Sequence, residues 1–237
     1  MSKNNLRAAT SCAGRFLALV FVSTIACSQS YKITPLGLIG NGDTNFADAI
    51  NSAGQVAGYE TGNSLPSGFG QAAVVWNSGT PTELFNPGGL YPAGANGIND
   101  SGVVVGQQRG AWAFAGGTLH GLSSIFGDAD AINSAGQIVG SDANLPGGTL
   151  TVVAAFWSSP AVGNSPILLD TLIGAGGESN ALAVNNSGQI VGSSVTASGP
   201  QHATFWKTDL ATALDLETLG GATSSATGIN DAGVIVG

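Results

Sequence analysis

Charged residues are scarce in this chain, and their scarcity excludes several classes of protein. Only 8% of the 237 residues are charged, whereas 43% are hydrophobic and 37 are glycine. Disordered chains are rich in charge and poor in branched apolar residues, so we expect a folded protein. Long helices favour Glu, Lys and Arg, and the chain has only 6 basic and 14 acidic residues. Abundant glycine with Val, Ile, Thr and Ser instead predicts short strands joined by tight turns, and therefore an all-β fold.

Cysteine and histidine are almost missing, which removes the usual metal and nucleophile chemistry. The two cysteines, Cys12 and Cys27, lie in the first 28 residues. The two histidines, His120 and His202, are far apart in the sequence, whereas a zinc site needs a cluster of such residues. Nucleophile-elbow and phosphate-loop patterns are also missing. The sequence therefore predicts no catalytic residue, no cofactor and no enzyme activity.

The first residues have the composition of an export signal. Basic residues precede a short apolar run at residues 16–26 (FLALVFVSTIA), and small residues follow it. We expect cleavage before Gln29, which makes residues 1–28 a signal peptide and the mature protein secreted, extracellular or periplasmic. Two alternatives stay open. Cleavage before Cys27 would leave a lipid-anchored protein, and an uncut leader would act as a membrane anchor.

Acidic residues dominate the chain that remains after this cleavage. It keeps three bases, Lys32, Arg109 and Lys207, against all 14 acids. A surface of this sign repels nucleic-acid phosphates and anionic lipid headgroups. We therefore expect a protein or glycan partner, with no nucleic acid and, unless Cys27 is lipidated, no membrane.

One 12-residue motif recurs five times without gaps. Its pattern is A-x-[AG]-[IV]-N-x-[SA]-G-[QV]-[VI]-[AV]-G, and the Ala, Asn and both Gly positions are filled in every copy. Self-similarity at a period of a few tens of residues is typical of repeat architectures. The copies occupy residues 47–58, 95–106, 129–140, 181–192 and 226–237.

Each motif predicts a β-hairpin between two short strands, called a and b. Asn favours the first position of a type I turn because its side chain bonds the backbone two residues on. Gly three residues later supplies the left-handed residue that closes such a turn with a bulge. The predicted turn residues are Asn51, Gly54, Asn99, Gly102, Asn133, Gly136, Asn185, Gly188, Asn230 and Gly233.

Two further elements follow each of the first four motifs. Strand c ends in an aromatic residue with Ala three residues before it, as in Ala154 and Trp157, and strand d is Leu-rich and ends near Gly. Four short strands per unit predict a β-propeller-like array of four-stranded repeats with an incomplete last unit, and a β-solenoid is the alternative. The expected units are about 41–90, 91–127, 128–175 and 176–221, then a partial unit 222–237 plus a d-type strand at 31–40.

These motifs carry a family resemblance. The turn motif, the stretch His202-Ala203-Thr204-Phe205-Trp206 and the L-x-x-L-G-G stretch at residues 216–221 resemble the bacterial extracellular HAF repeat family over residues 31–237. The resemblance implies an exported repeat protein and no particular activity. His202 alone matches the family's histidine, and Gln71 and Arg109 lie near that place in other copies.

Three residues are candidates for binding. Asp100 and Asp231 follow the turn Asn in two copies, and carboxylates there suit Ca²⁺, although a turn favours Asp at this position anyway. Trp112 lies two residues before Phe114, out of register with the other tryptophans. Because exposed aromatic residues mark binding surfaces, Trp112 is the predicted ligand surface.

Two functions stay open at this point. The first is an exported, non-catalytic repeat protein that acts as a structural or interaction module, with the loops between strands b and c as its variable surface. The alternative is a secreted carbohydrate-active hydrolase or lyase that uses acidic residues at the propeller axis. The missing nucleophile–base pair favours the first.

Overall fold

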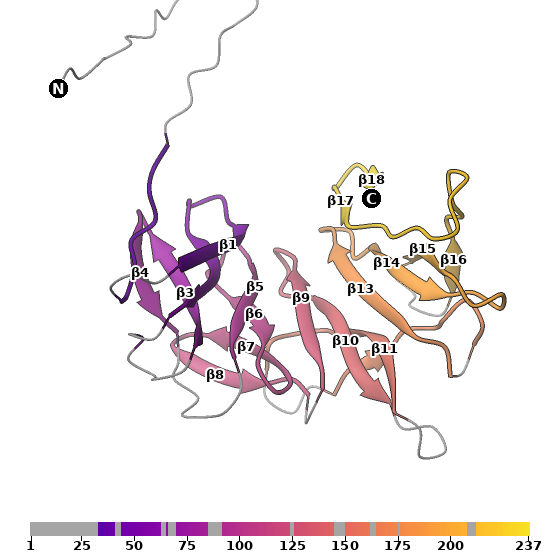
Figure 1. Ribbon diagram of the computed structural model, residues 1–237, viewed down its shortest axis with the longest axis horizontal. Helices are drawn as coiled ribbons and strands as arrows, with labels where there is room; N and C mark the ends of the chain where they lie inside the picture. Colours follow the sequence, from indigo (N-terminus) through magenta and orange to yellow (C-terminus); the bar gives the residue numbers. More distant parts are fainter. Residues whose placement is uncertain are drawn as a thin grey trace, which may run out of the picture. The chain divides into compact units, whose positions relative to one another are not determined.

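Strands are the only regular structure in the part of the chain that the structure describes. The computed structural model describes residues 33–40, 44–62, 65, 70–84, 92–123, 126–144, 150–161, 165–174, 176–207 and 212–237. All strands lie within the compact unit Leu36–Gly237 (Figure 1). No helix of the described residues is long and apolar enough to cross a membrane. The predicted signal peptide, residues 1–28, lies outside the described residues.

The described strands form five antiparallel sheets. The first sheet contains β1 Thr44–Ile50, β2 Val56–Thr61, β3 Gln71–Asn77 and β4 Thr80–Glu83. The second contains β5 Gly94–Ile98, β6 Val104–Gln107, β7 Ala111–Ala115 and β8 Thr118–Gly121. The third contains β9 Asp128–Ile132, β10 Ile138–Asn144, β11 Thr151–Trp157 and β12 Ile167–Leu168. The last two contain β13 Ser179–Val184, β14 Ile190–Val195, β15 Gln201–Trp206 and β16 Ala213–Asp215, then β17 Gly228–Ile229 and β18 Ile235–Val236.

Each sheet is made of consecutive strands from one repeat unit, so the all-β prediction is confirmed. Four sheets have the order a-b-c-d, and the fifth has strands a and b. Every described pairing is antiparallel and joins neighbours in the sequence. In a parallel β-helix, equivalent strands of successive coils pair with each other. The observed pairing therefore differs from that of the β-solenoid alternative.

The expected d-type strand at residues 31–40 is wrong for the described part of that segment. Residues 33–40 contain no strand. The Gly37 amide donates to Gly79 O (2.8 Å) in the turn between β3 and β4, and Gly37 O accepts the Trp76 indole N–H (2.7 Å). The backbone groups of Gly37 are thus satisfied by a turn and a side chain instead of a neighbouring strand.

The hydrophobic core is divided among the interfaces between successive sheets. Strand b of each sheet contacts strand a of the next, in the pairs β2 with β5, β6 with β9, β10 with β13 and β14 with β17. A unit cannot bury both of its faces alone, so stacking creates the core. The residues buried between the second and third sheets, for example, are Val105, Ala111, Ala113, Leu122, Ala129, Ile138, Ala155 and Trp157.

The last Gly of each motif lies against the neighbouring strand. Strand a bulges at the residue after the motif Ala, and the register shifts there in the first four sheets. This bulge brings a carbonyl close to strand b, so a Cβ placed on Gly140 would lie 1.9 Å from Asp128 O. The other four copies leave equally little room, at 1.9–2.0 Å. Only glycine fits this position.

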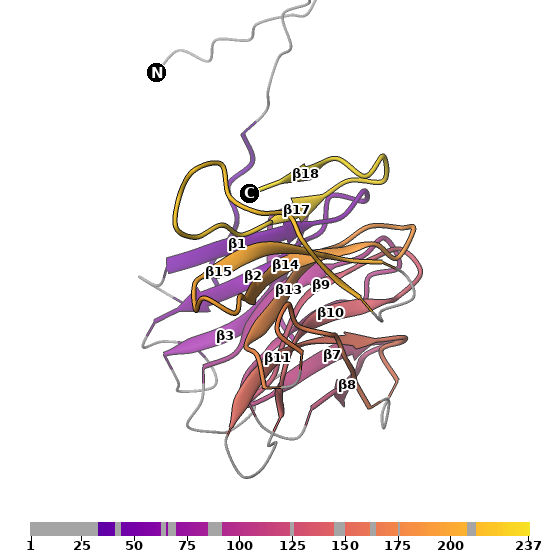
Figure 2. The same cartoon turned by 90° about the vertical axis from the view of Figure 1, so that its right-hand side faces the viewer.

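The other motif Gly closes the hairpin turn. Gly54, Gly102, Gly136, Gly188 and Gly233 have φ between 74° and 82°. In each turn the Gly amide donates to the carbonyl of the Asn three residues before it, as Gly136 N does to Asn133 O (3.0 Å). This is the left-handed conformation that the sequence predicts. The a–b turns lie on one side of the molecule, on the right in Figure 2.

The two glycine roles give a direct test. We expect Gly140→Ala to lower the free energy of unfolding by about 2–3 kcal/mol because its Cβ overlaps the Asp128 carbonyl. Gly136→Val should cost more than about 1 kcal/mol through its φ of 82°. Gly121→Ala, in β8 with no atom within 4 Å of the new Cβ, is the control and should change stability by less than about 0.5 kcal/mol. Denaturant unfolding measures all three, and equal stabilities would contradict these assignments.

Candidate functional site

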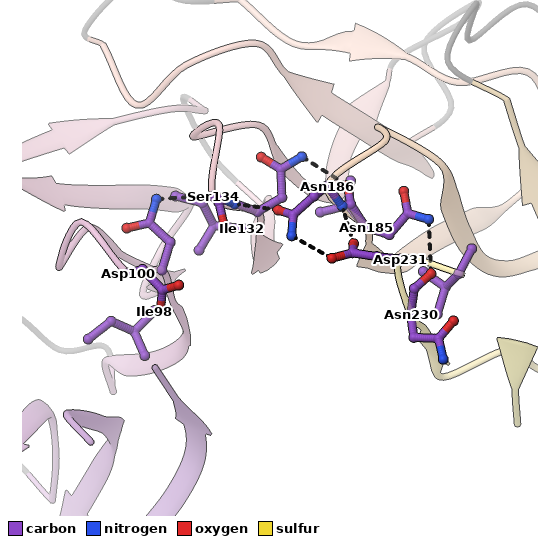
Figure 3. Close-up of a pocket in the computed structure, with 12 residues that line it drawn as sticks. Ile98, Asp100, Ile132, Ser134, Asn185, Asn186, Asn230 and Asp231 are labelled. Atoms are coloured by element: carbon purple, nitrogen blue, oxygen red, sulfur yellow. Dashed lines mark hydrogen bonds between the residues drawn. The ribbon is translucent and has the colours of Figure 1, made fainter. Parts of the chain in front are cut away.

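The hairpin turns surround a polar hollow of about 330 Å³, which we call the turn hollow (Figure 3). Units two to five each supply three consecutive residues to it: an apolar residue, the turn Asn and the residue that follows. The lining residues are Ile98, Asn99, Asp100, Ile132, Asn133, Ser134, Val184, Asn185, Asn186, Ile229, Asn230 and Asp231. It is the first candidate for a site because most of these side chains are polar.

Each turn Asn organises its own turn through its side-chain oxygen. Asn133 Oδ1 accepts the amides of Ala135 (3.1 Å) and Gln137 (2.9 Å), two and four residues on. The same pair of bonds forms at Asn99, Asn185 and Asn230. This local role is the one that the motif predicts.

The side-chain nitrogen of the same Asn reaches into the next unit. Asn51 Nδ2 donates to Asn99 O (3.1 Å), and Asn99 Nδ2 donates to Asn133 O (3.1 Å). Asn133 and Asn185 continue the series, donating to Asn185 O and Asn230 O at 3.0 Å. We call this series the asparagine ladder. Sequence reasoning missed this ladder, although the presence of Asn in all five motifs was a signal. Asp or Ser can also cap a turn, but only Asn has both a carbonyl oxygen that accepts and an NH₂ group that donates.

A second row of bonds runs through the residue after each Asn. The Ser52 amide donates to Asp100 Oδ1 (2.8 Å), and the Ser134 amide to Asn186 Oδ1 (3.0 Å). Asn186 donates its amide and its Nδ2 to Asp231, both at 2.8 Å (Figure 3). These bonds lower the pKa of Asp100 and Asp231, since each carboxylate accepts backbone N–H groups. Both groups are therefore acceptors that hold neighbouring units and are poor proton donors at neutral pH.

The residues considered for Ca²⁺ are thus engaged between units. Asp100 and Asp231 each bond the preceding turn in the array. Within the described ranges no three His, Cys, Asp or Glu side chains form a group suited to a metal ion. The turn hollow therefore offers two separately held carboxylates among side-chain amides and the hydroxyl of Ser134.

Trp112 is not the exposed ligand surface that the sequence predicts. Its side chain is only 3% exposed and packs between the first and second sheets. Trp112 lies opposite Gly106 in the strand pairing, where Val74 and Ala155 face the equivalent glycines. Phe114 lies opposite Val104, the register position that Trp157 occupies opposite Ile138. A bulky residue beside a glycine is covered by the neighbouring sheet, which sequence periodicity does not reveal.

A pair of acids lies apart from the turn hollow. Asp128 and Asp130 are on β9, with Asp130 at the bulge. Burial raises the pKa of Asp130 to about 7, the charge of Asp128 adds to the rise, and the Asn180 side chain opposes it. Asp130 Oδ2 and Asn180 Oδ1 are both buried, and neither has a hydrogen-bond partner among the described residues. The protonated form of Asp130 is favoured because burial disfavours its charge by more than the Asn180 hydrogen bond favours it.

The described residues also hold one histidine–carboxylate pair. His202 Nδ1 on β15 lies 3.0 Å from Asp215 Oδ2 on β16. Ser194 pairs with His202 in the β14–β15 register, but its hydroxyl is buried and accepts the Leu172 amide (3.1 Å). The His202–Asp215 pair therefore joins β15 to β16. The Ser194 hydroxyl instead bonds the segment that connects the third and fourth sheets.

Comparison with known proteins found no protein-family model and no curated protein that matches the chain. The resemblance to HAF repeats therefore rests on the motif residues alone.

The asparagine ladder can be separated from the turn by one substitution. Asn99→Asp keeps the oxygen that caps the turn but replaces the N–H donor with a charged oxygen facing Asn133 O. We expect a loss of about 2–3 kcal/mol in the free energy of unfolding, since Asn99 is buried. Asn230→Asp is the control, because Asn230 is exposed and its described bonds use only Oδ1. Equal effects in urea unfolding would mean that the ladder contributes nothing.

Asp130 gives a pH prediction with a definite sign. Its pKa is about 7 in the folded chain and near 3.8 when exposed, so the folded state binds more protons between these values. The free energy of unfolding should therefore fall as pH rises from about 4 to about 7. Asp130→Asn should flatten this slope and melt at a higher temperature than wild type at pH 8. Asp48→Asn, at the same bulge position in β1, should act in the same direction and more weakly. An unchanged slope in Asp130→Asn contradicts the assignment.

Proposed function

We propose that this chain is an exported, non-catalytic repeat protein that serves as an interaction scaffold of the β-propeller type. The rigid part is the stack of sheets with its asparagine ladder. The recognition surface is the opposite end, where strands b and c are connected. The expected ligand is a cell-surface glycan or a protein.

The observation that carries this proposal is the use of the polar side chains in the turn hollow. Asp100, Asp231 and three of the turn asparagines that line it (Asn99, Asn133 and Asn185) bond the neighbouring unit. A catalytic carboxylate must be free to exchange a proton or to attack a substrate. Side chains already held as structural acceptors support a scaffold better than an active site.

The connections between strands b and c support the recognition surface. They span residues 62–70, 108–110, 145–150 and 196–200 in the four complete sheets. The turns between strands a and b keep one length and one hydrogen-bond pattern in all five units. Variable loops on a constant scaffold are where binding residues concentrate.

One observation favours the alternative, a carbohydrate-active hydrolase. A carboxyl group with a pKa near 7, as at Asp130, suits a general acid. However, Asp130 Oδ2 is buried, and neither Asp128 nor Asp130 lines the turn hollow.

The scaffold proposal is tested by a binding screen of the full chain against a glycan array and cell-wall fractions. We expect saturable binding to a ligand class without release of products. Replacing residues 145–150 with the short 108–110 connection (Gln-Arg-Gly) should change the ligand profile, and replacing residues 196–200 in the same way tests a second part of the same surface. Retained binding in both variants would contradict the loop surface. Product release that Asp130→Asn abolishes would favour the hydrolase.

A further inference from the structure

A pocket of about 210 Å³ lies between the first and second sheets, beside the a–b turns, and we call it the Phe114 pocket. Both sheets contain all four strands of a unit, so the pocket is internal to the array of sheets. Gln55, Asn77 and Thr82 supply polar side chains to its lining, together with Gly102. The apolar part of the lining consists of Val75, Leu84, Ile98, Val104 and Phe114.

The same five apolar positions form closed core at the next two interfaces between sheets. In the strand pairing, Phe114 takes the register position that Trp157 and Trp206 hold in later sheets. Both tryptophans are 0% exposed, whereas Phe114 is partly exposed. Leu84 is also partly exposed, although the equivalent leucines of the next two sheets are buried. The smaller ring therefore leaves the interface between the first two sheets open. The equivalent closed sets are Ala113, Leu122, Ile132, Ile138 and Trp157, then Phe156, Leu169, Val184, Ile190 and Trp206.

At the closed interfaces the indole N–H bonds a backbone carbonyl of the preceding unit. Trp157 Nε1 donates to Leu122 O (3.1 Å), and the tryptophans at this register in the first and fourth sheets also donate to a preceding carbonyl, at 2.7 and 2.6 Å. Leu84 is the equivalent of Leu122, because both amides donate to the strand c alanine that precedes the aromatic residue by three positions. Phe114 has no N–H group, so Leu84 O lacks the indole donor that Leu122 O receives.

The volume and lining of the Phe114 pocket suit one flat ring system. An apolar protein cavity of about 150 Å³ holds benzene, so about 210 Å³ leaves room for a bicyclic ring. The exposed part of the Phe114 ring offers an aromatic surface, and Leu84 O offers a hydrogen-bond acceptor. Small-molecule sites combine apolar walls with a few polar groups that fix the orientation of the ligand. A bicyclic ring with one N–H donor matches both features.

We propose that the Phe114 pocket binds a small molecule built on a bicyclic aromatic ring with an N–H donor, of which indole is the simplest case. The ring lies against Phe114, and its N–H bonds Leu84 O as Trp157 bonds Leu122 O. The polar residues of the lining contact substituents on the ring. No residue of the b–c connections lines this pocket, so the inference does not depend on the function proposed above.

Isothermal titration calorimetry of the full chain with indole tests the proposal. We expect saturable binding at one site per chain. Benzofuran, which has an oxygen where indole has the N–H, should bind at least five-fold more weakly because it cannot donate to Leu84 O. N-acetyltryptophanamide carries the same ring on a peptide backbone and should also bind more weakly, since the ring alone fills the pocket. Equal or tighter binding of this compound would assign the pocket to a tryptophan of a partner protein and overturn the small-molecule ligand.

Two substitutions exchange the ring between the open and closed interfaces. Phe114→Trp supplies the missing indole from the chain itself, so it should abolish indole binding and raise the melting temperature by about 2–4 °C. Leu214→Trp is the matched control, because it adds the same ring at an exposed position of β16 and should leave indole binding unchanged. Trp157→Phe removes the ring from the next interface and should create a second site, which doubles the stoichiometry.

Several results would overturn the proposal. These are no saturable binding of indole, equal binding of benzofuran, or indole binding that Phe114→Trp retains. Loss of binding in Leu214→Trp would place the site outside the pocket. A Trp157→Phe variant that circular dichroism shows to be folded, but that binds a single indole, would contradict the equivalence of the two interfaces. Nuclear magnetic resonance gives an independent readout, since added indole should shift the ring protons of Phe114.

Discussion

A single side-chain amide joins each hairpin turn to the next. The oxygen of the turn Asn closes its own turn, and the nitrogen bonds the backbone of the following turn, as Asn133 does with Asn185. A hydrogen bond of this kind contributes only about 1 kcal/mol net, so packing between the sheets supplies most of the stability. The ladder fixes something different, the relative position of successive units. It holds that position although linked asparagines are separated by 34 residues in one case and 52 in another.

The bulge in strand a works together with this ladder. It places a carbonyl against the last Gly of the motif, which explains why that position admits no Cβ. It also turns the extra residue toward the next unit, and Asn96 there donates Nδ2 to Ala129 O (3.1 Å). Among the motif's invariant residues, the last Gly therefore serves the contact between strands a and b of one sheet. The Asn serves the contacts between units. Asp130 occupies the same bulge position, where burial raises its pKa.

The sequence was sufficient for features that depend on local chemistry. Turn conformation at Gly54 or Gly136 follows from the offset between Asn and Gly, because both residues act within one turn. Trp112 was misplaced because burial depends on the neighbouring sheet, which strand alternation does not describe. The segment before β1 resembled strand d in its residues, yet it bonds a turn and an indole. The asparagine ladder was missed for the same reason, since its acceptors belong to another unit.

The polar residues of the repeated motif are the first candidates for a functional site because they recur in every unit. In this chain, however, they bond one another across units. Substituting them is expected to change stability before it changes recognition. The b–c connections take no part in the asparagine ladder, and their lengths differ within this one chain. Two chains with identical motifs and different b–c connections should therefore share a fold and differ in ligand.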